Sequence, residues 1–503
     1  MKPNNANLYI KNYFENDIRG KVSALIRLKN VALLVIFDGE KELEVIDTKQ
    51  LSKDVETDDF VRLMVTPEKS KQSFKLLKLE KLDLNHPFIK TFSAKMKLLT
   101  AAKTVKTMVQ SNVYPALKPL FLQAVRLIKK AVFERRPIII RHHFDTDGYC
   151  GALAIEKAII SVALEINRNP QDIKRLLKRV PCTLPFYDLD EAVSDINAFL
   201  DNSSLEKEPL LILIDNGSTN EDLLGLNKLN IYDFQVIVID HHVPALDENK
   251  DFKVDSLTKV HINPYKTNGD SNLTAGMLCS EIAYMMAPKL KNLDCLATLS
   301  GVADKSSAKE FGDYLDLVQS KGYDKAFLKK LAKVIDYLTS CIRKKESRTF
   351  IDNLFDFGNK IQYKTVELIY PELAEMEQLR LKTINRFLER LIVNDIFVAK
   401  FDFKSFIKRG SYPSAGKSAG LILDELKKEH DKVLVIAYGE DSLVIRTSGI
   451  DVDVNDFINF ERKSKPYTEI EGGGHKHTAS VRFIKIVRDE IIDDLIKWLT
   501  KND

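Results

Sequence analysis

The sequence predicts an α/β protein that is built around a doubly wound parallel sheet. Three observations support this fold class. Short apolar runs alternate with helical periodicity over residues 136–305, which is typical of a parallel sheet with helices on both faces. Short strand-like runs separated by turns fill residues 1–91 and indicate a small β-barrel. Residues 306–392 have helical spacing only, and residues 393–503 return to strands and helices. We therefore expect a helical insertion and a smaller C-terminal α/β domain after the sheet.

Length and composition indicate a cytoplasmic protein of several domains. The chain has 503 residues, of which 44% are hydrophobic, and no apolar run approaches the ~20 residues that span a bilayer. The first residues lack the apolar core of a signal peptide. The five cysteines are scattered without a Cys-X-X-Cys pair, which predicts a reducing compartment and no zinc knuckle. Because the net charge is only +4, any affinity for nucleic acid would come from local basic patches.

Residues 1–91 are expected to form a barrel of the oligonucleotide/oligosaccharide-binding (OB) kind. Their strand-like runs suffice for a five-stranded barrel, and Asp38-Gly39 is a hairpin signal. Such barrels bind single strands through a basic groove and stacking aromatic residues. The alternative is a barrel that contacts protein or only packs against the catalytic domain. The candidate nucleic-acid contacts are Arg27, Lys29, Arg62, Lys71, Phe74 and Lys75.

Residues 92–135 are expected to be a helical connector between the barrel and the sheet. Apolar residues from Leu98 to Val109 follow helical spacing. A second helix is predicted from Pro119 to Phe133, because proline suits the first position of a helix.

The sequence HFDTDG at residues 143–148 follows an apolar run at residues 137–140 and precedes helical spacing. A strand, an acidic loop and a helix in this order place a site at the carboxyl edge of an α/β sheet. Asp145 and Asp147, beside His143, could hold a divalent metal ion. The alternative is an ordinary helix N-terminus that is capped by an aspartate.

Acidic residues follow three further apolar runs in this part of the chain. These positions are Asp215, the triplet Asp240-His241-His242, and Asp304. Most of the nine histidines fall in short motifs of this kind, which scattered structural histidines would not do. The recurrence predicts a carboxylate–imidazole metal site. Oxygen ligands mixed with imidazole suit manganese better than calcium or structural zinc, with magnesium as the alternative.

Taken in order, the motifs HFDTDG, LIDNG, IDHH and VAD resemble the four motifs of the DHH phosphoesterase superfamily. GGGHKHTAS near the C-terminus resembles the signature of the DHH-associated domain. The resemblance covers about residues 136–305 and 393–490. It is strongest to archaeal RecJ-like single-strand exonucleases that carry an OB-like domain in front. It implies a phosphodiesterase with two metal ions ~3.5–4 Å apart that act in in-line displacement at phosphorus.

The resemblance also implies a set of metal ligands. These are His143, Asp145, Asp147, Asp215, His241 and Asp304. Asp215 would bridge the two ions, Asp145 would bind one ion with His143, and Asp147 would bind the other. His241 and Asp304 would complete the second site. Several relatives carry their histidine four residues before the first aspartate, where this sequence has Arg141, whereas His143 lies two residues before it.

Two residues of the IDHH motif are expected to have roles other than metal binding. Asp240 precedes the histidines and would orient an imidazole from behind. His242 would contact the scissile phosphate. Adjacent histidines can serve such opposite roles, because a metal ligand must be neutral whereas a proton helps at a phosphate.

The C-terminal domain, residues 393–503, resembles the substrate-binding domain of the superfamily. Gly473, Gly474 and His475 lie in its glycine-rich motif, where backbone donors can converge on an anion. The alternative is a plain turn between two strands. Arg446 resembles the substrate-binding arginine of the family. The alternative interpretation of Arg446 is a surface arginine at the end of a strand.

Residues 306–392 are expected to be a helical insertion and linker. This insertion could be a lid over the substrate channel or merely the helix that joins two lobes. Its basic residues could form a nucleic-acid track or a solvated face. They are Lys329, Lys330, Lys333, Arg343, Lys344, Lys345 and Arg348. Residues 410–418 do not match an ATP-binding loop, so a helix start with Lys417 near the nucleic-acid path is expected there.

The resemblance implies a manganese-dependent exonuclease for single-stranded DNA or RNA, acting in DNA replication or repair. One alternative is a phosphodiesterase of short oligonucleotides or cyclic dinucleotides. An alternative of another class is a structural subunit that is associated with a helicase or replisome. The barrel favours a long substrate, and the presence of all metal positions argues against a non-catalytic subunit. The expected partners are single-stranded nucleic acid and a helicase or replisome component, with no membrane.

Overall fold

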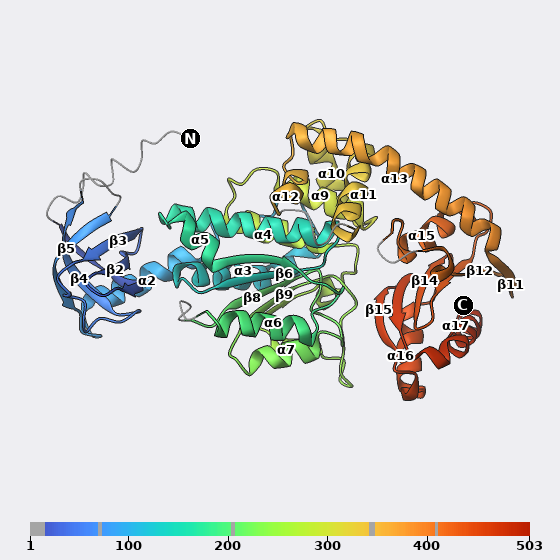
Figure 1. Ribbon diagram of the computed structural model, residues 1–503, viewed down its shortest axis with the longest axis horizontal. Helices are drawn as coiled ribbons and strands as arrows, with labels where there is room; N and C mark the ends of the chain where they lie inside the picture. Colours follow the sequence, from blue (N-terminus) through green and yellow to red (C-terminus); the bar gives the residue numbers. More distant parts are fainter. Residues whose placement is uncertain (1–15, 69–72, 203–206, 342–347, 408–410, 503) are drawn as a thin grey trace.

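The computed structural model describes residues 16–68, 73–202, 207–341, 348–407 and 411–502. It confirms the predicted fold class, with a closed barrel at one end, a parallel sheet covered by helices in the centre, and an α/β domain at the other end (Figure 1). No helix in these ranges is long and apolar enough to cross a membrane. The basic candidates Lys71, Arg343, Lys344 and Lys345 lie outside the described residues.

The N-terminal barrel is closed, with the strand order β1-β2-β3-β5-β4. Its strands are β1 (Asn16–Arg27), β2 (Ala32–Phe37), β3 (Glu42–Asp47), β4 (Phe60–Pro67) and β5 (Ser73–Lys81). β3 and β5 pair in parallel, and the other neighbours are antiparallel. Phe74 is only 3% exposed and packs in the barrel core, so its predicted role as a stacking residue is wrong. Arg27, Lys29, Arg62 and Lys75 are exposed.

The connector consists of α2 (Pro87–Thr100) and α3 (Tyr114–Phe133). The first helix ends at Thr100, earlier than predicted, because the backbone is extended at Ala101. The second helix begins at Tyr114, earlier than the predicted start at Pro119. Tyr114 is buried and anchors the first turn of α3, so Pro119 lies inside the helix rather than at its start.

The central sheet has five parallel strands in the order β10-β9-β8-β6-β7. They are β6 (Ile138–His142), β7 (Leu177–Pro181), β8 (Leu210–Ile214), β9 (Gln235–Ile239) and β10 (Val260–Ile262). The strand order reverses at β6, which has β7 on one side and β8 on the other. Ligands of open α/β sheets bind outside the carboxyl ends of the strands at such a switch point.

Successive residues of the buried strands face two different cores, as expected for a doubly wound sheet. Leu210 and Ile212 belong to one hydrophobic cluster with residues of α4, α8 and α9, whereas Leu211 and Leu213 pack with α6 and α7. The helices around the sheet are α4 (Thr146–Glu165), α5 (Pro170–Leu176), α6 (Leu189–Leu200), α7 (Leu223–Asn230), α8 (Ala275–Met286) and α9 (Leu293–Ala303).

The segment after α9 is helical, as predicted. It contains α10 (Lys309–Gln319), α11 (Lys325–Cys341), α12 (Arg348–Leu354) and α13 (Lys360–Phe387). Apolar residues of α11, such as Leu331 and Val334, join the core of the central domain. The long helix α13 then runs from this helical group to the C-terminal domain (Figure 1).

The C-terminal domain is built on a mixed sheet in the order β11-β12-β13-β14-β16-β15. Its strands are β11 (Glu389–Val393), β12 (Ile396–Asp402), β13 (Val433–Tyr438), β14 (Ser442–Ser448), β15 (Glu471–His475) and β16 (Thr478–Arg482). Its helices are α14 (Phe403–Phe406), α15 (Ala415–Leu426), α16 (Val454–Ser464) and α17 (Arg488–Asn502). The glycine-rich motif is therefore an edge strand that pairs with β16, and β14 with Arg446 lies one strand further in.

Candidate metal centre

The acidic motif after β6 occupies the start of α4. Asp145 is the N-cap of this helix and accepts a hydrogen bond from the Gly148 N–H at 3.0 Å. Asp147 lies in the first helical turn and is fully buried. Its carboxylate accepts hydrogen bonds from the backbone N–H groups of Ala275 at 3.0 Å and Gly276 at 2.8 Å. These donors belong to the N-terminus of α8. The first turn of α4 thus places Asp147, and the N-terminus of α8 holds its carboxylate.

Asp215 follows β8 and adopts a left-handed backbone conformation with a φ of 61°. This conformation is uncommon for a residue other than glycine and is frequent at functional sites. Its two carboxylate oxygens face different histidines. Oδ2 lies 3.3 Å from His143 Nδ1, and Oδ1 lies 3.2 Å from His241 Nε2.

The six predicted ligands form two groups that meet at Asp215. His143, Asp145 and Asp215 present ligand atoms within 4.8 Å of one another. Asp147, His241 and Asp304 form a second such group. The His241 Nε2 atom lies 3.4 Å from Asp304 Oδ2 and 3.6 Å from Asp147 Oδ2.

Three buried atoms at the junction of these groups make no hydrogen bond among the described residues, although oppositely charged groups lie 2.8–3.3 Å from them. The three atoms are His143 Nδ1, His241 Nε2 and Asp215 Oδ1. Buried polar atoms are normally paired, so an orphaned cluster needs an explanation. Imidazole nitrogens and carboxylate oxygens that converge in this way fit divalent metal ions, which would satisfy all three atoms at once.

The pKa shifts reflect the crowding of acidic groups in a buried place. Burial and the neighbouring Asp215 carboxylate raise the pKa of Asp147 to about 7. Burial and the Asp147 carboxylate raise the pKa of Asp304 well above its ordinary value. Burial alone would lower the pKa of His241, but the surrounding carboxylates, Asp215 first, outweigh it and raise that pKa. A bound cation would relieve this repulsion and hold the acids ionised.

Asp240 is already engaged in hydrogen bonds to neighbouring groups. Its oxygens accept from the backbone N–H groups of His241 at 2.8 Å and Ser218 at 3.2 Å. Its Oδ1 also lies 2.8 Å from His242 Nδ1. This contact fixes the His242 ring with Nε2 on the opposite side. Likewise, His241 Nδ1 lies 2.6 Å from the carbonyl oxygen of Ser271, which leaves His241 Nε2 to face the carboxylates.

Two neighbouring side chains make contacts away from the acidic groups. Arg141, at the position where several relatives carry histidine, is buried and forms an ion pair with Asp195 at 2.7 Å. The His142 Nδ1 atom lies 2.7 Å from the carbonyl oxygen of His143. Of the adjacent pair, only His143 therefore faces the acidic groups.

The C-terminal domain reaches this centre through its glycine-rich edge strand. The His475 ring stacks on His242 with a centroid distance of 4.8 Å and an interplanar angle of 15°. Burial and the neighbouring histidines, His242 first, lower the pKa of His475 well below its ordinary value. Burial likewise lowers the pKa of Arg446 to about 10. A cavity of about 300 Å³ between the domains is lined by His242, Gly473 and Gly474.

Sequence reasoning missed the residues that join the two domains beside this cavity. Glu221 accepts a hydrogen bond from the Gly472 N–H at 3.0 Å and forms an ion pair with Arg462 at 3.1 Å. Lys417 lies in the first turn of α15, as its predicted helix start implies, and pairs with Asp336 at 2.9 Å. Asp336 also accepts a hydrogen bond from the Thr146 N–H at 3.1 Å, between the two aspartates of the first motif.

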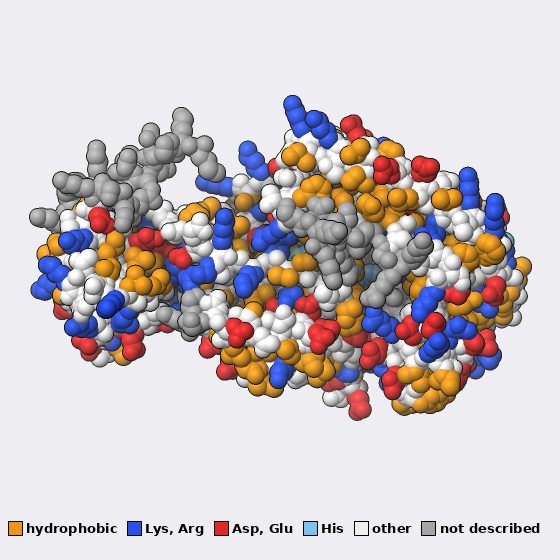
Figure 2. All heavy atoms as spheres, viewed as in Figure 1, with side chains coloured by type: hydrophobic (Ala, Val, Ile, Leu, Met, Phe, Trp, Pro, Cys, Tyr) orange, Lys and Arg blue, Asp and Glu red, His pale blue; other side chains and the backbone are white. Residues whose placement is uncertain are grey.

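Several basic residues of the insertion have partners within the protein. Lys333 pairs with Glu377 at 2.6 Å, and Arg348 pairs with Glu156. Figure 2 shows lysine and arginine side chains interspersed with acidic and apolar ones over the face drawn. These contacts favour the solvated-face interpretation of the insertion over a continuous basic track.

Comparisons with known proteins agree with this arrangement. The sequence pattern of the DHH family, N-terminal domain, matches residues 137–301. A solved structure described as the DHH domain of a member of the s1p family of ribosomal proteins is 32% identical, with a TM-score of 0.77, over 82% of this chain and 98% of that chain. The chain therefore belongs to the DHH family, and its class is that of the DHH-superfamily phosphoesterases.

Two further relatives extend the comparison. An uncharacterized protein of Methanocaldococcus jannaschii is 29% identical over 519 residues, which cover 95% of this chain and 68% of that protein. RecJ from Thermus thermophilus, solved in complex with Mn²⁺, is 14% identical with a TM-score of 0.51, over 76% of this chain and 55% of that chain. At this identity the likeness to RecJ is one of fold.

Proposed function

We propose that the protein is a manganese-dependent exonuclease for single-stranded DNA or RNA that acts in replication or repair, with magnesium as an alternative ion. The observation that carries the proposal is the position of Asp215. One of its oxygens faces each of two carboxylate–histidine groups, beside a cavity between two domains. A single bridging carboxylate between two ion sites is what a two-metal phosphodiesterase needs.

The residues divide into ligands and substrate contacts. His143 and Asp145 would hold one ion, Asp147, His241 and Asp304 the other, and Asp215 both. Two divalent ions at such a site activate a water molecule and stabilise the leaving oxygen at phosphorus. Among the described residues, Asp215 alone offers one oxygen to each of the two groups.

On the substrate side, His242 is held through Nδ1 by Asp240, whose carboxylate outweighs burial and raises the pKa of His242. The protonated ring can then donate a hydrogen bond from Nε2 to a phosphate oxygen. Arg446 and His475 would hold the strand from the C-terminal domain, since an arginine fork and an imidazole suit phosphate oxygens. The N–H groups of Gly473 and Gly474 belong to the same strand β15.

The chain organisation fits a long substrate. We propose that it divides into a nucleic-acid-binding barrel (1–91), a helical connector (92–135), a catalytic domain (136–305), a helical linker (306–392) and a substrate-binding domain (393–503). A short oligonucleotide or a cyclic dinucleotide would need only the cavity between the last domain and the catalytic one. A strand that extends beyond this cavity could also be bound by a barrel of the kind that binds single strands.

Digestion of end-labelled single-stranded DNA and RNA with manganese, magnesium or a chelator tests the proposal. We expect stepwise shortening with manganese and none with the chelator. Asp215→Ala should reduce cleavage at least ~100-fold, because loss of a metal-positioned nucleophile costs several kcal/mol. Asp190→Ala, which removes an exposed carboxylate of α6, is the matched control. Cleavage of dinucleotides alone would identify a small-molecule phosphodiesterase instead.

A further inference from the structure

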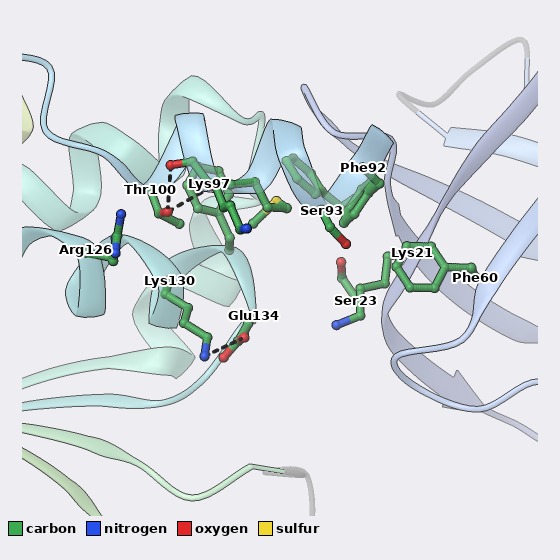
Figure 3. A pocket seen from close by; sticks show the side chains of 13 residues that line it. Lys21, Ser23, Phe60, Phe92, Ser93, Lys97, Thr100, Arg126, Lys130 and Glu134 are labelled. Carbon is green, nitrogen blue, oxygen red and sulfur yellow. Dashed lines mark hydrogen bonds and ion pairs between the residues drawn. The ribbon is translucent and has the colours of Figure 1, made fainter. Parts of the chain in front are cut away.

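A second cavity lies between the barrel and the connector helices, away from every metal-site motif. Its volume is about 650 Å³, and residues of β1, β2, β4, α2 and α3 line it. Figure 3 shows Phe60 and Lys21 of the barrel facing Phe92 and Ser93 of α2, with Arg126 and Lys130 of α3 on another side. Cavities of ~300–1,000 Å³ are typical of small-molecule sites.

The inner part of this cavity is aromatic. Phe37, Phe60, Phe92 and Phe133 all line it. The Phe60 and Phe92 rings meet edge to face with centroids 5.1 Å apart, and Phe37 lies 5.9 Å from Phe92. Phe37, Phe92 and Phe133 are buried, whereas Phe60 is half-buried and is held by its edge-to-face contact with Phe92. Phe60 is therefore the ring that offers a surface to a ligand, and a ring held in this way favours a flat ring as ligand, because stacking on it costs little ordering entropy.

The rim of the cavity is basic. Its charged lining residues are Lys21, Lys97, Arg126, Lys130 and Glu134. Lys21 pairs with Asp58 at 2.8 Å and Lys130 with Glu134 at 3.7 Å. Lys97 and Arg126 are exposed and have no ion pair within the part of the chain that the structure describes. Two cations are thus left to receive an anionic group at the mouth of an aromatic cavity.

The cavity is preformed, because buried ion pairs fix the barrel against the central domain. Glu42 at the start of β3 is 7% exposed. It pairs with Arg135 at 2.8 Å and with Arg168 of the loop after α4. Lys207 bridges to Asp58 of the barrel at 2.8 Å. A preformed site loses little free energy to ordering when a ligand binds.

We propose that this cavity is a second nucleotide-binding site, which takes one base against Phe60 and the attached phosphate at Lys97 and Arg126. The base and its phosphate could belong to a free mononucleotide or to one nucleotide of a bound strand. The site is distinct from the metal centre, and the proposal does not depend on the nuclease activity.

Calorimetric titration of the full-length chain in chelator, with AMP, inorganic phosphate and a single-stranded decanucleotide as separate probes, tests the site. The double variant Lys97→Ala/Arg126→Ala removes the exposed cations and should bind about tenfold more weakly, as expected for loss of charge-assisted contacts. Ser93→Trp places a bulky side chain in the cavity from an exposed position. Lys90→Ala, an exposed residue of α2 outside the cavity, is the matched control. Arg482→Ala, at a residue that lines the cavity beside the metal centre, reports AMP that binds there.

Weaker AMP binding by both cavity variants, but not by Lys90→Ala, would assign the site to a free nucleotide. Weaker decanucleotide binding with no AMP binding would assign it to a base of the bound strand. The proposal is overturned if the cavity variants bind AMP and the decanucleotide as wild type does. It is also overturned if inorganic phosphate binds as tightly as AMP, since Phe60 then contributes nothing.

Discussion

Substitution of Glu221 should separate the two domains that form the cavity beside the metal centre. Its carboxylate accepts from the Gly472 N–H at 3.0 Å and pairs with Arg462 at 3.1 Å. Charge-assisted hydrogen bonds contribute ~1.5–3 kcal/mol each, but the Arg462 side chain is 31% exposed, which reduces its share. For both contacts together we expect ~2 kcal/mol, or about 30-fold in the equilibrium between apposed and separated domains.

Steady-state cleavage of an oligonucleotide measures this effect. Glu221→Ala should raise KM by up to about 30-fold while calorimetry still detects two bound manganese ions, since Glu221 is not among the predicted ligands. Glu221→Gln keeps an acceptor for Gly472 N–H and should fall in between. Glu248→Ala, an exposed carboxylate of the same domain, should behave as wild type. Small-angle scattering without substrate gives a second measure, because the Ala variant should be more extended. An unchanged KM and an unchanged scattering profile would refute the role of Glu221 in holding the two domains together.

Three further predictions concern the C-terminal domain, the barrel and a buried acid. Arg446→Ala and His475→Ala should each keep two bound manganese ions by calorimetry yet cleave a strand at least ~10-fold more slowly, and loss of an ion by either variant would place the domain in the metal shell. Replacement of two exposed barrel lysines, in Lys29→Ala/Lys75→Ala, should leave dinucleotide cleavage intact and weaken binding of long strands, with a loss that shrinks as salt rises. Equal affinity for a long strand would remove these lysines from the binding surface. Burial raises the pKa of Glu281 to about 7, above that of the unfolded chain, so the folded state binds more protons between pH ~4.5 and ~7. Stability should therefore fall by up to about 3 kcal/mol as pH rises through that window, and Glu281→Gln should flatten this dependence in denaturant titrations.

The parallel sheet and its acidic loops were predictable because the signals are local. Three of the motifs are an apolar strand followed at once by Asp or His, and parallel strands bring their carboxyl ends to one edge. Asp304 instead follows the apolar helix α9. Contacts between distant segments gave no such signal. Glu221 and Arg462 are 241 residues apart, and neither lies in a recognisable motif. The same holds for Lys417, which reaches Asp336 on another domain.

The wrong predictions for the barrel and the connector also have a physical cause. Phe74 and Lys75 were both assigned to a nucleic-acid groove, although adjacent residues of a strand point to opposite faces. In β5 the burial alternates accordingly, with Phe74 inside and Lys75 exposed. In α3, tertiary packing of Tyr114 outweighs the preference of Pro119 for a helix start.

The arrangement around α4 links metal binding to the position of the C-terminal domain. Asp145 and Asp147 flank Thr146, whose N–H donates to Asp336, and Asp336 in turn pairs with Lys417 of the C-terminal domain at 2.9 Å. Glu221 forms a second connection from the loop that follows Asp215. Both loops that carry the bridging and flanking carboxylates are thus tied to the domain that we propose holds the strand. Movement of that domain would therefore displace the carboxylates as well as the substrate contacts, so strand binding and the geometry of the metal site should change together.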